Sequence, residues 1–169
     1  MSSIASFFLV PEERLPALRA LAGESIQIGK PGLLGPGKSA TRDPWWEYLR
    51  EHATELERFN WSGSVMWAVE RYLDARRVRL RAFADEAVTG PLSSARGTDI
   101  LVFHAEAAGR LAQSLVGLRP SPATAASFVA QDSGHPNELQ AQALLAGFGT
   151  LRRWLAAVGG RQCGLLIIG

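Results

Sequence analysis

Three short apolar segments, spaced far apart along the chain, most constrain its fold. They lie near the start, in the middle and at the end of the sequence, at residues 4–10, 99–103 and 163–168. Short runs of apolar and aromatic residues such as these are typical of buried β-strands. Because the middle segment is apolar on both faces, we expect it in the centre of a sheet.

Helical patterns fill the stretches between the predicted strands. Acidic residues and a proline at 11–13 and at 43–44 mark two helix starts, because both residue types suit a first turn. Ser62 and Asn137 are the predicted N-caps of two further helices. We also expect a helix directly after the middle strand and a short one at 123–130.

Residues 76–88 fit two patterns. From Val78 to Ala82 every second residue is apolar and the others are arginines, which is typical of an edge strand. From Leu80 to Ala87 the apolar residues also have helical spacing, which predicts a helix that ends at Gly90 and Pro91. We favour the helix.

A strand near each end, one between them and helices in the intervals predict an α/β fold. We expect a single three-layer domain over residues 1–169, with a central sheet of few strands flanked by helices. The length of 169 residues suits one domain with a proper core.

Composition narrows the classes of partner and site. The formal net charge is only +2, which does not favour a nucleic-acid partner. No apolar run has the length of a membrane span, and no signal peptide is apparent. A single cysteine, Cys163, excludes an internal disulfide, and three scattered histidines do not have metal-ligand spacing. We therefore expect a bacterial cytoplasmic protein without a metal or another cofactor.

The N-terminal residues follow a pattern that is known from a protein family. The residues that carry it are Met1, Ser2, Ile4, Phe7, Val10, Glu13, Leu15 and Leu18. Their order resembles the opening of the YfbM-like family of uncharacterised bacterial proteins, and the helix start at 43–46 and the apolar end at 165–169 are similar to features of those chains. The resemblance implies a three-layer α/β fold and no known activity, so it supplies no catalytic residues.

Residues 32–39 satisfy the phosphate-binding pattern G-x-x-x-x-G-K-S. In such a loop the backbone around Gly37 and the amine of Lys38 would hold phosphates, and Ser39 would ligate Mg²⁺. The motif requires a helix directly after it, whereas the predicted helix start at 43–44 follows only after a gap. We therefore favour a glycine- and proline-rich loop over a working phosphate site.

His104 and Glu106 lie where the middle strand ends and the next helix begins. This is the usual ligand position in open α/β sheets. His104 could act as a general base, or bind an anion together with free N–H groups of the helix. A histidine that caps or packs under the helix is the interpretation that we favour, so both residues are weak catalytic candidates.

Tryptophans on two predicted helices are candidates for partner binding. In the helix that begins at 43–44, Trp46 leads the predicted core face and Trp45 widens it. Trp67 falls opposite the apolar stripe of its helix, beside Arg71, so it is covered by another layer, stacked under Arg71, or exposed for a partner. Core filling or arginine stacking is favoured.

The leading functional prediction is a non-catalytic protein that binds a partner protein or a small ligand. The loop at 23–43 and the tryptophan-bearing helices would form its recognition surface. The alternative is a nucleotide- or phosphate-binding protein, or a small enzyme, that uses the loop at 32–39 or His104.

Overall fold

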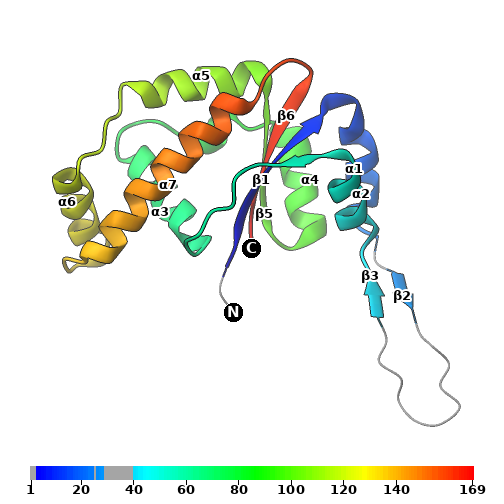
Figure 1. The fold of residues 1–169 in the computed structure, drawn as a ribbon, viewed down its shortest axis with the longest axis horizontal. Coiled ribbons are helices and arrows are strands. Elements are labelled where there is room, and N and C mark those ends of the chain that lie inside the picture. Colours follow the sequence, from blue (N-terminus) through cyan, green and yellow to red (C-terminus); the bar gives the residue numbers. More distant parts are fainter. Residues whose placement is uncertain (1–2, 25, 29–39) are drawn as a thin grey trace, which may run out of the picture.

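Four strands form an antiparallel sheet in the middle of the computed structural model, which describes residues 3–24, 26–28 and 40–169 (Figure 1). The order across the sheet is β4-β1-β6-β5. The strands are β1 (Ala5–Pro11), β4 (Thr54–Glu55), β5 (Asp99–His104) and β6 (Gln162–Ile168). The three long strands match the three apolar segments of the sequence.

Helices cover both faces of the sheet, which confirms the predicted three-layer α/β fold (Figure 1). One face carries α3 (Ser64–Asp74), α5 (Ala105–Val116), α6 (Pro122–Ser133) and α7 (Glu138–Ala157). The other face carries α1 (Leu15–Leu21), α2 (Pro44–His52) and α4 (Glu86–Arg96). Two short 3₁₀ helices, η1 (Glu12–Arg14) and η2 (Leu80–Phe83), lie in the connections.

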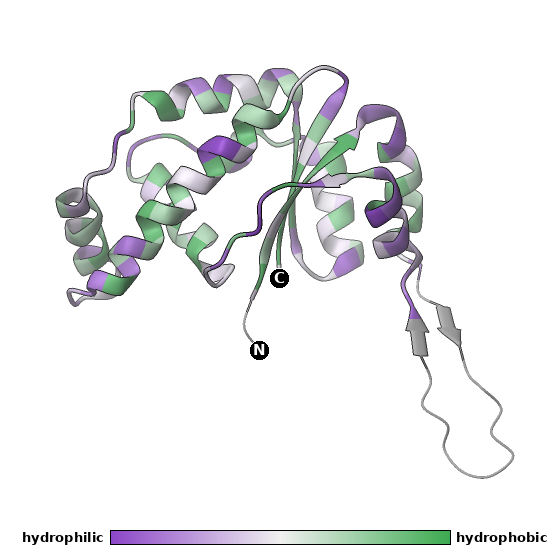
Figure 2. Cartoon of the chain, viewed as in Figure 1, coloured by the Kyte–Doolittle hydropathy of each residue, from purple (hydrophilic) through white to green (hydrophobic). Residues whose placement is uncertain are grey.

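Strand β6 occupies the interior of the sheet and contributes to two hydrophobic cores. Leu166 and Ile168 face the core under α7, whereas Leu165 and Ile167 face the core under α4. Figure 2 shows the long strands mainly green, whereas the helices carry both green and purple residues. Successive β6 side chains enter opposite cores because side chains alternate between the two faces of a strand, and here both faces are covered.

The prediction that the strand at 99–103 is central is wrong, because β5 is the last strand of the sheet. Its outer edge is closed by side chains of α4. The hydroxyl oxygen of Thr89 accepts a hydrogen bond from Val102 N at 3.0 Å, and that of Ser93 accepts one from Ile100 N at 3.0 Å. Four residues of a helix span about 6 Å and two residues of a strand about 6.7 Å, so the two hydroxyls match alternate amides.

Most predicted helix starts are confirmed. The carboxylate of Asp43 accepts a hydrogen bond from Trp46 N at 3.2 Å, and the side chain of Asn137 accepts one from Gln140 N at 3.0 Å. Two starts differ: at residues 11–13 the chain forms the 3₁₀ helix η1 and α1 begins only at Leu15, and the N-cap of α3 is Gly63 rather than Ser62. A Cβ at Gly63 would lie 2.7 Å from the carbonyl carbon of Ile4, so this close approach requires glycine.

The favoured helix through residues 80–87 is also wrong. Only the 3₁₀ turn η2 forms there, and α4 starts after Asp85 and continues through Gly90 and Pro91 to Arg96. The carboxylate of Asp85 accepts a hydrogen bond from Ala87 N at 3.0 Å. This cap separates η2 from α4 and sets a helix boundary inside the apolar stripe.

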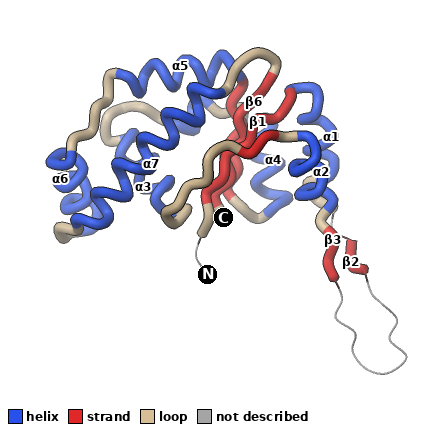
Figure 3. The backbone as a smooth tube through the Cα atoms, viewed as in Figure 1, coloured by secondary structure: helices blue, strands red, loops and turns tan. Residues whose placement is uncertain are grey.

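A separate antiparallel ribbon consists of β2 (Ile26–Ile28) and β3 (Ala40–Arg42). Figure 3 shows both strands in red, outside the three layers. The candidate phosphate-binding residues Gly37, Lys38 and Ser39 lie outside the described residues. Strand β3 begins at residue 40, so the helix that a phosphate loop requires does not follow directly.

Candidate functional site

His104 is held between two carboxylates at one end of the sheet. Its Nδ1 lies 3.1 Å from Oε1 of Glu12, and its Nε2 lies 2.9 Å from Oδ2 of Asp85. These hydrogen bonds, first that of Asp85 and then that of Glu12, raise the pKa of His104. An imidazolium that donates through both nitrogens has no lone pair to accept a proton. The arrangement therefore favours a structural link between η1, β5 and α4 over a general base.

Glu106 does not join this cluster. Its carboxylate pairs with Arg110 one turn later on α5, and its side chain is 84% exposed. The residues that do contact His104 are Glu12 and Asp85, neither of which was predicted as a site residue. They lie 92 and 19 positions away in the sequence, so no local spacing indicates the cluster.

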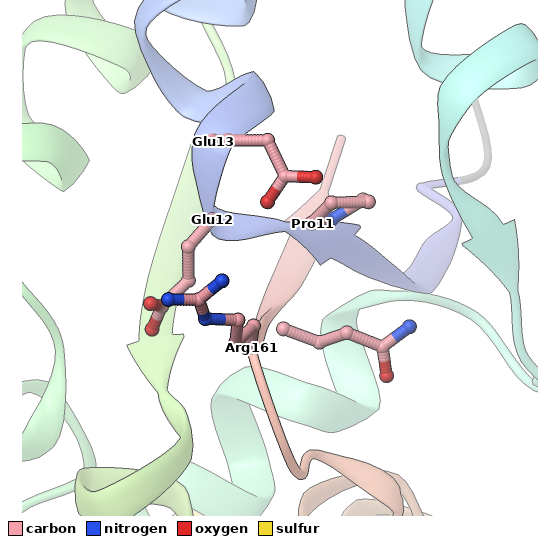
Figure 4. Close-up of a pocket in the computed structure, with 5 residues that line it drawn as sticks. Pro11, Glu12, Glu13 and Arg161 are labelled. Carbon is pink, nitrogen blue, oxygen red and sulfur yellow. The ribbon is translucent and has the colours of Figure 1, made fainter.

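A depression of about 630 Å³ lies beside this cluster (Figure 4). It is lined by Pro11, Glu12, Glu13, Arg161 and Gln162. Acidic and basic side chains both line the depression, and it lacks the apolar walls of a typical ligand pocket. Within residues 3–24, 26–28 and 40–169, no group of three or more histidine, cysteine or acidic side chains could hold a metal ion. We assign no ligand to this depression.

A cavity of about 350 Å³ lies at the opposite end of the sheet, on the face that α1, α2 and α4 cover. We call it the Trp–Arg pocket. Its apolar lining is Ile4, Trp45, Trp46 and Ile167, and its polar lining includes Ser6, Arg96 and Thr98. The two indole rings are 4.9 Å apart and nearly perpendicular, at 82°. The cavity therefore combines aromatic walls with a small number of polar groups, as ligand sites commonly do.

Trp45, and not Trp46 as predicted, lies on the buried face of α2. Trp45 and Leu49 form the fully buried face of α2, and Trp46 is only partly buried. The ring of Trp46 lies 6.2 Å from that of Phe8 on β1. The prediction that Trp46 leads the core face is thus wrong by one position, because the approach of α2 to the sheet sets the buried face.

Arg96 at the end of α4 is fixed at the pocket by contacts with three residues. Its guanidinium carbon lies 4.8 Å from the centre of the Trp45 ring. Nη1 donates to Oδ1 of Asp43 at 3.2 Å and to the carbonyl oxygen of Ala22 at 3.4 Å, and Nη2 donates to Oδ2 of Asp43. Burial raises the pKa of Asp43, but hydrogen bonds from Arg96 and the Trp46 backbone outweigh this and hold it below its ordinary value. The ion pair is therefore intact at neutral pH.

The indole nitrogen of Trp45 is a buried donor whose hydrogen bond is not supplied by the part of the chain that the structure describes. A buried N–H group without an acceptor costs about 1–3 kcal/mol. Such groups are uncommon in native proteins. The sequence pattern indicated Trp45 as a candidate residue, but it did not indicate Arg96.

Trp67 and Arg71 lie on a different surface, over a groove between α3, α6 and α7. Trp67 is 37% exposed, and its Nε1 donates to Oδ2 of Asp99 at 3.1 Å. Arg71 binds Asp132 of α6 through two nitrogens, at 3.0 and 2.7 Å. The favoured core-filling or arginine-stacking interpretation of Trp67 is wrong, since Asp99 and Asp132 hold the two side chains separately.

No helix in the described part of the chain combines the length and the apolar character needed to cross a bilayer. Comparisons of the chain with family models, curated proteins and solved structures found no match. The resemblance to the YfbM-like family therefore stays a prediction.

Proposed function

We propose that this protein is a non-catalytic binding protein of the bacterial cytoplasm, which takes a small molecule in the Trp–Arg pocket. One observation carries the proposal: the pocket joins two perpendicular indole rings to an arginine that is already held in place. A fixed polar group in an apolar cavity provides orientation, and the apolar walls provide affinity.

Neither His104 nor Cys163 is in a state suited to act as a base or a nucleophile, which supports binding rather than catalysis. His104 is engaged through both ring nitrogens. Cys163 is buried in β6, and burial raises the pKa of its thiol to about 12. A thiol with this pKa contributes almost no thiolate at neutral pH, and thiolate is the nucleophilic form.

A fragment screen on two matched tryptophan variants tests the proposal. Trp46 and Trp67 are both partly exposed, but only Trp46 lines the Trp–Arg pocket. We expect fragments detected by ligand-observed NMR on the wild type to lose their signal on Trp46→Ala and to keep it on Trp67→Ala. The proposal fails if no small aromatic or aliphatic fragment binds, or if Trp67→Ala alone abolishes binding.

A protein partner on the groove beside Trp67 is the second candidate function. Its specific support is the 37% exposure of Trp67, since exposed tryptophans are enriched among residues that dominate interfaces. Loss of binding on Trp67→Ala alone would favour this candidate. Nucleotide binding through Lys38 is the remaining alternative, and a thermal shift with Mg-ATP that disappears in Lys38→Ala would favour it.

A further inference from the structure

We propose that Glu12, His104 and Arg161 form a pH-sensitive switch at the end of the sheet opposite the Trp–Arg pocket. The Glu12 carboxylate binds the His104 ring while that ring is protonated, and it moves to Arg161 when the ring is neutral. This inference is independent of the proposed function, because other residues line the Trp–Arg pocket.

The ring of His104 is placed as a protonated imidazolium. Its Nδ1 lies 3.1 Å from Oε1 of Glu12, and its Nε2 lies 2.9 Å from Oδ2 of Asp85. Because an ionised carboxylate only accepts hydrogen bonds, both ring nitrogens must carry a proton to bind both partners. The side chain of His104 is 40% exposed, so the ring can exchange its proton with solvent. A neutral ring carries a single N–H group, and one of the two links is then lost.

Asp85 is the partner that the neutral ring keeps. Its carboxylate also accepts a hydrogen bond from Ala87 N at 3.0 Å, as the N-cap of α4. Its own amide donates to the carbonyl oxygen of Val102 at 2.8 Å. Both contacts hold Asp85 in place whether or not His104 is protonated. The remaining proton of the ring therefore stays on Nε2, and the lone pair of Nδ1 faces Glu12.

Glu12 is the partner that leaves. The lone pair of Nδ1 and the carboxylate oxygen are both acceptors, so they repel each other at 3.1 Å. Within the described ranges, the Glu12 carboxylate has no hydrogen-bond partner other than His104. Its side chain is 43% exposed and one methylene longer than that of Asp85, so it can adopt another rotamer.

Arg161 provides the second position for the Glu12 carboxylate. The amide of Glu12 donates to the carbonyl oxygen of Arg161 at 3.0 Å, so the two residues lie side by side. Both side chains line the same depression, and Figure 4 shows that of Arg161 extending toward Glu12. In the part of the chain that the structure describes, the guanidinium of Arg161 forms no ion pair. It is available to Glu12 once His104 is neutral.

The elements around His104 carry further titratable or charged side chains, namely Glu13, Arg14, Glu86, Glu106, Arg110 and Cys163. Glu106 and Arg110 pair with each other on α5. Burial raises the pKa of the Cys163 thiol to about 12, so it stays protonated while His104 titrates. Glu13 lines the depression together with Arg161, and it is therefore the carboxylate against which the role of Glu12 is tested.

The exchange changes the charge that the depression presents to solvent. Hydrogen bonds from Asp85 and then Glu12 raise the pKa of His104 above its ordinary value of 6.5. Below that pKa Glu12 neutralises His104, and the guanidinium of Arg161 is unpaired. Above it the neutral ring releases Glu12, which then neutralises Arg161. The pH therefore decides whether the depression carries an unpaired arginine.

Double-mutant cycles at two pH values test the exchange. Urea unfolding of the full chain is measured for wild type, Glu12→Gln, Arg161→Gln and the double variant, at about pH 6 and about pH 9. We expect no coupling between Glu12 and Arg161 at the lower pH. At the higher pH we expect about a threefold coupling in the unfolding equilibrium constant, as for a partly exposed ion pair. The variants should fold, because both side chains are exposed.

A matched cycle uses Glu13→Gln in place of Glu12→Gln. Glu13 is also exposed and also lines the depression, but it does not contact His104. Its coupling with Arg161 should be the same at both pH values. This control separates an exchange of partners from a general effect of pH on charges near Arg161.

Ring-nitrogen signals of His104 in ¹H–¹⁵N spectra identify the link that the neutral ring keeps. The signals are assigned by their loss in His104→Gln. We expect the neutral ring to carry its proton on Nε2, toward Asp85. A proton on Nδ1 would overturn the switch, and so would a Glu12–Arg161 coupling that is equal at both pH values. A Glu13–Arg161 coupling that rises with pH as much as that of Glu12 would also overturn it.

Discussion

Replacing Thr89 by valine tests how the edge of the sheet is closed. The Thr89 side chain is 5% exposed, and its hydroxyl oxygen accepts a hydrogen bond from Val102 N at 3.0 Å. Valine has nearly the same shape, so Thr89→Val removes the acceptor without leaving a cavity. The amide of Val102 would then face a methyl group in a buried position. An unpaired buried N–H group costs about 1–3 kcal/mol, and we expect the free energy of unfolding to fall by about 2 kcal/mol.

Urea unfolding and hydrogen exchange measure the two parts of this prediction. For a chain of this length, 2 kcal/mol corresponds to a decrease in Tm of about 4–8 °C and to a lower urea midpoint at an unchanged slope. The amide of Val102 should also exchange faster with solvent. Thr89→Ser is the matched control, because it keeps the hydroxyl and loses one methyl group, which costs about 0.8 kcal/mol.

Two results would refute the reasoning. If Thr89→Val unfolds at the wild-type urea concentration and Val102 stays protected, the hydroxyl does not close the edge of β5. If Thr89→Ser loses as much stability as Thr89→Val, packing of the methyl group and not the hydrogen bond accounts for the effect.

Three further substitutions have defined expected outcomes. Arg77, just after the end of α3, has a φ of 64°, a backbone conformation that strains any residue except glycine. Arg77→Gly should therefore raise the free energy of unfolding by about 0.5–1 kcal/mol, measured by thermal unfolding. An unchanged or lower Tm would contradict this strain. A Cβ at Gly164 would overlap the ring of Phe7, and calorimetry of Gly164→Ala should show a loss of about 1–3 kcal/mol; a neutral result would mean that the ring moves aside. Hydrogen bonds to Asp85 and Glu12 raise the pKa of His104 above its unfolded value of 6.5, so the protonated ring stabilises the folded protein. This stabilisation is fully present below pH 6.5 and is lost as the pH rises through the pKa of His104 in the folded protein. The stability advantage of wild type over His104→Gln should therefore shrink above pH 6.5 in urea titrations, and an advantage that grows with pH would reverse the assignment.

Local sequence patterns predicted most of the secondary structure. The apolar runs at residues 4–10 and 163–168 became β1 and β6, because short, continuous runs of apolar side chains suit a strand covered on both faces. Asp43 and Asn137 cap their helices as predicted, since a cap depends on contacts only three residues apart. The failure at residues 80–87 is also local: the cap at Asp85 competes with a continuous apolar stripe, and the stripe alone does not reveal it.

The composition of the candidate site was predicted only in part. Trp45 and Trp46 were identified as candidates, but Arg96 was not, although it completes the same pocket. Arg96 and Asp43 are 53 positions apart, and one arginine among many carries no spacing signal. The predicted pair of His104 and Glu106 likewise separates, since the first turn of α5 directs Glu106 to solvent.

The sequence by itself determined the three long strands, most of the helices and most of the helix starts, because these depend on contacts within a few residues. The tertiary structure alone decided which strand lies inside the sheet, which face of α2 is buried and which charged groups meet. An apolar strand has the same burial pattern in the centre of a sheet or at an edge closed by a helix. For β5 the second case holds, because the hydroxyls of Thr89 and Ser93 and the backbone of Asp85 bond to its outer edge. Positions of this kind are set by the packing of distant segments, so they become visible only once the chain is folded.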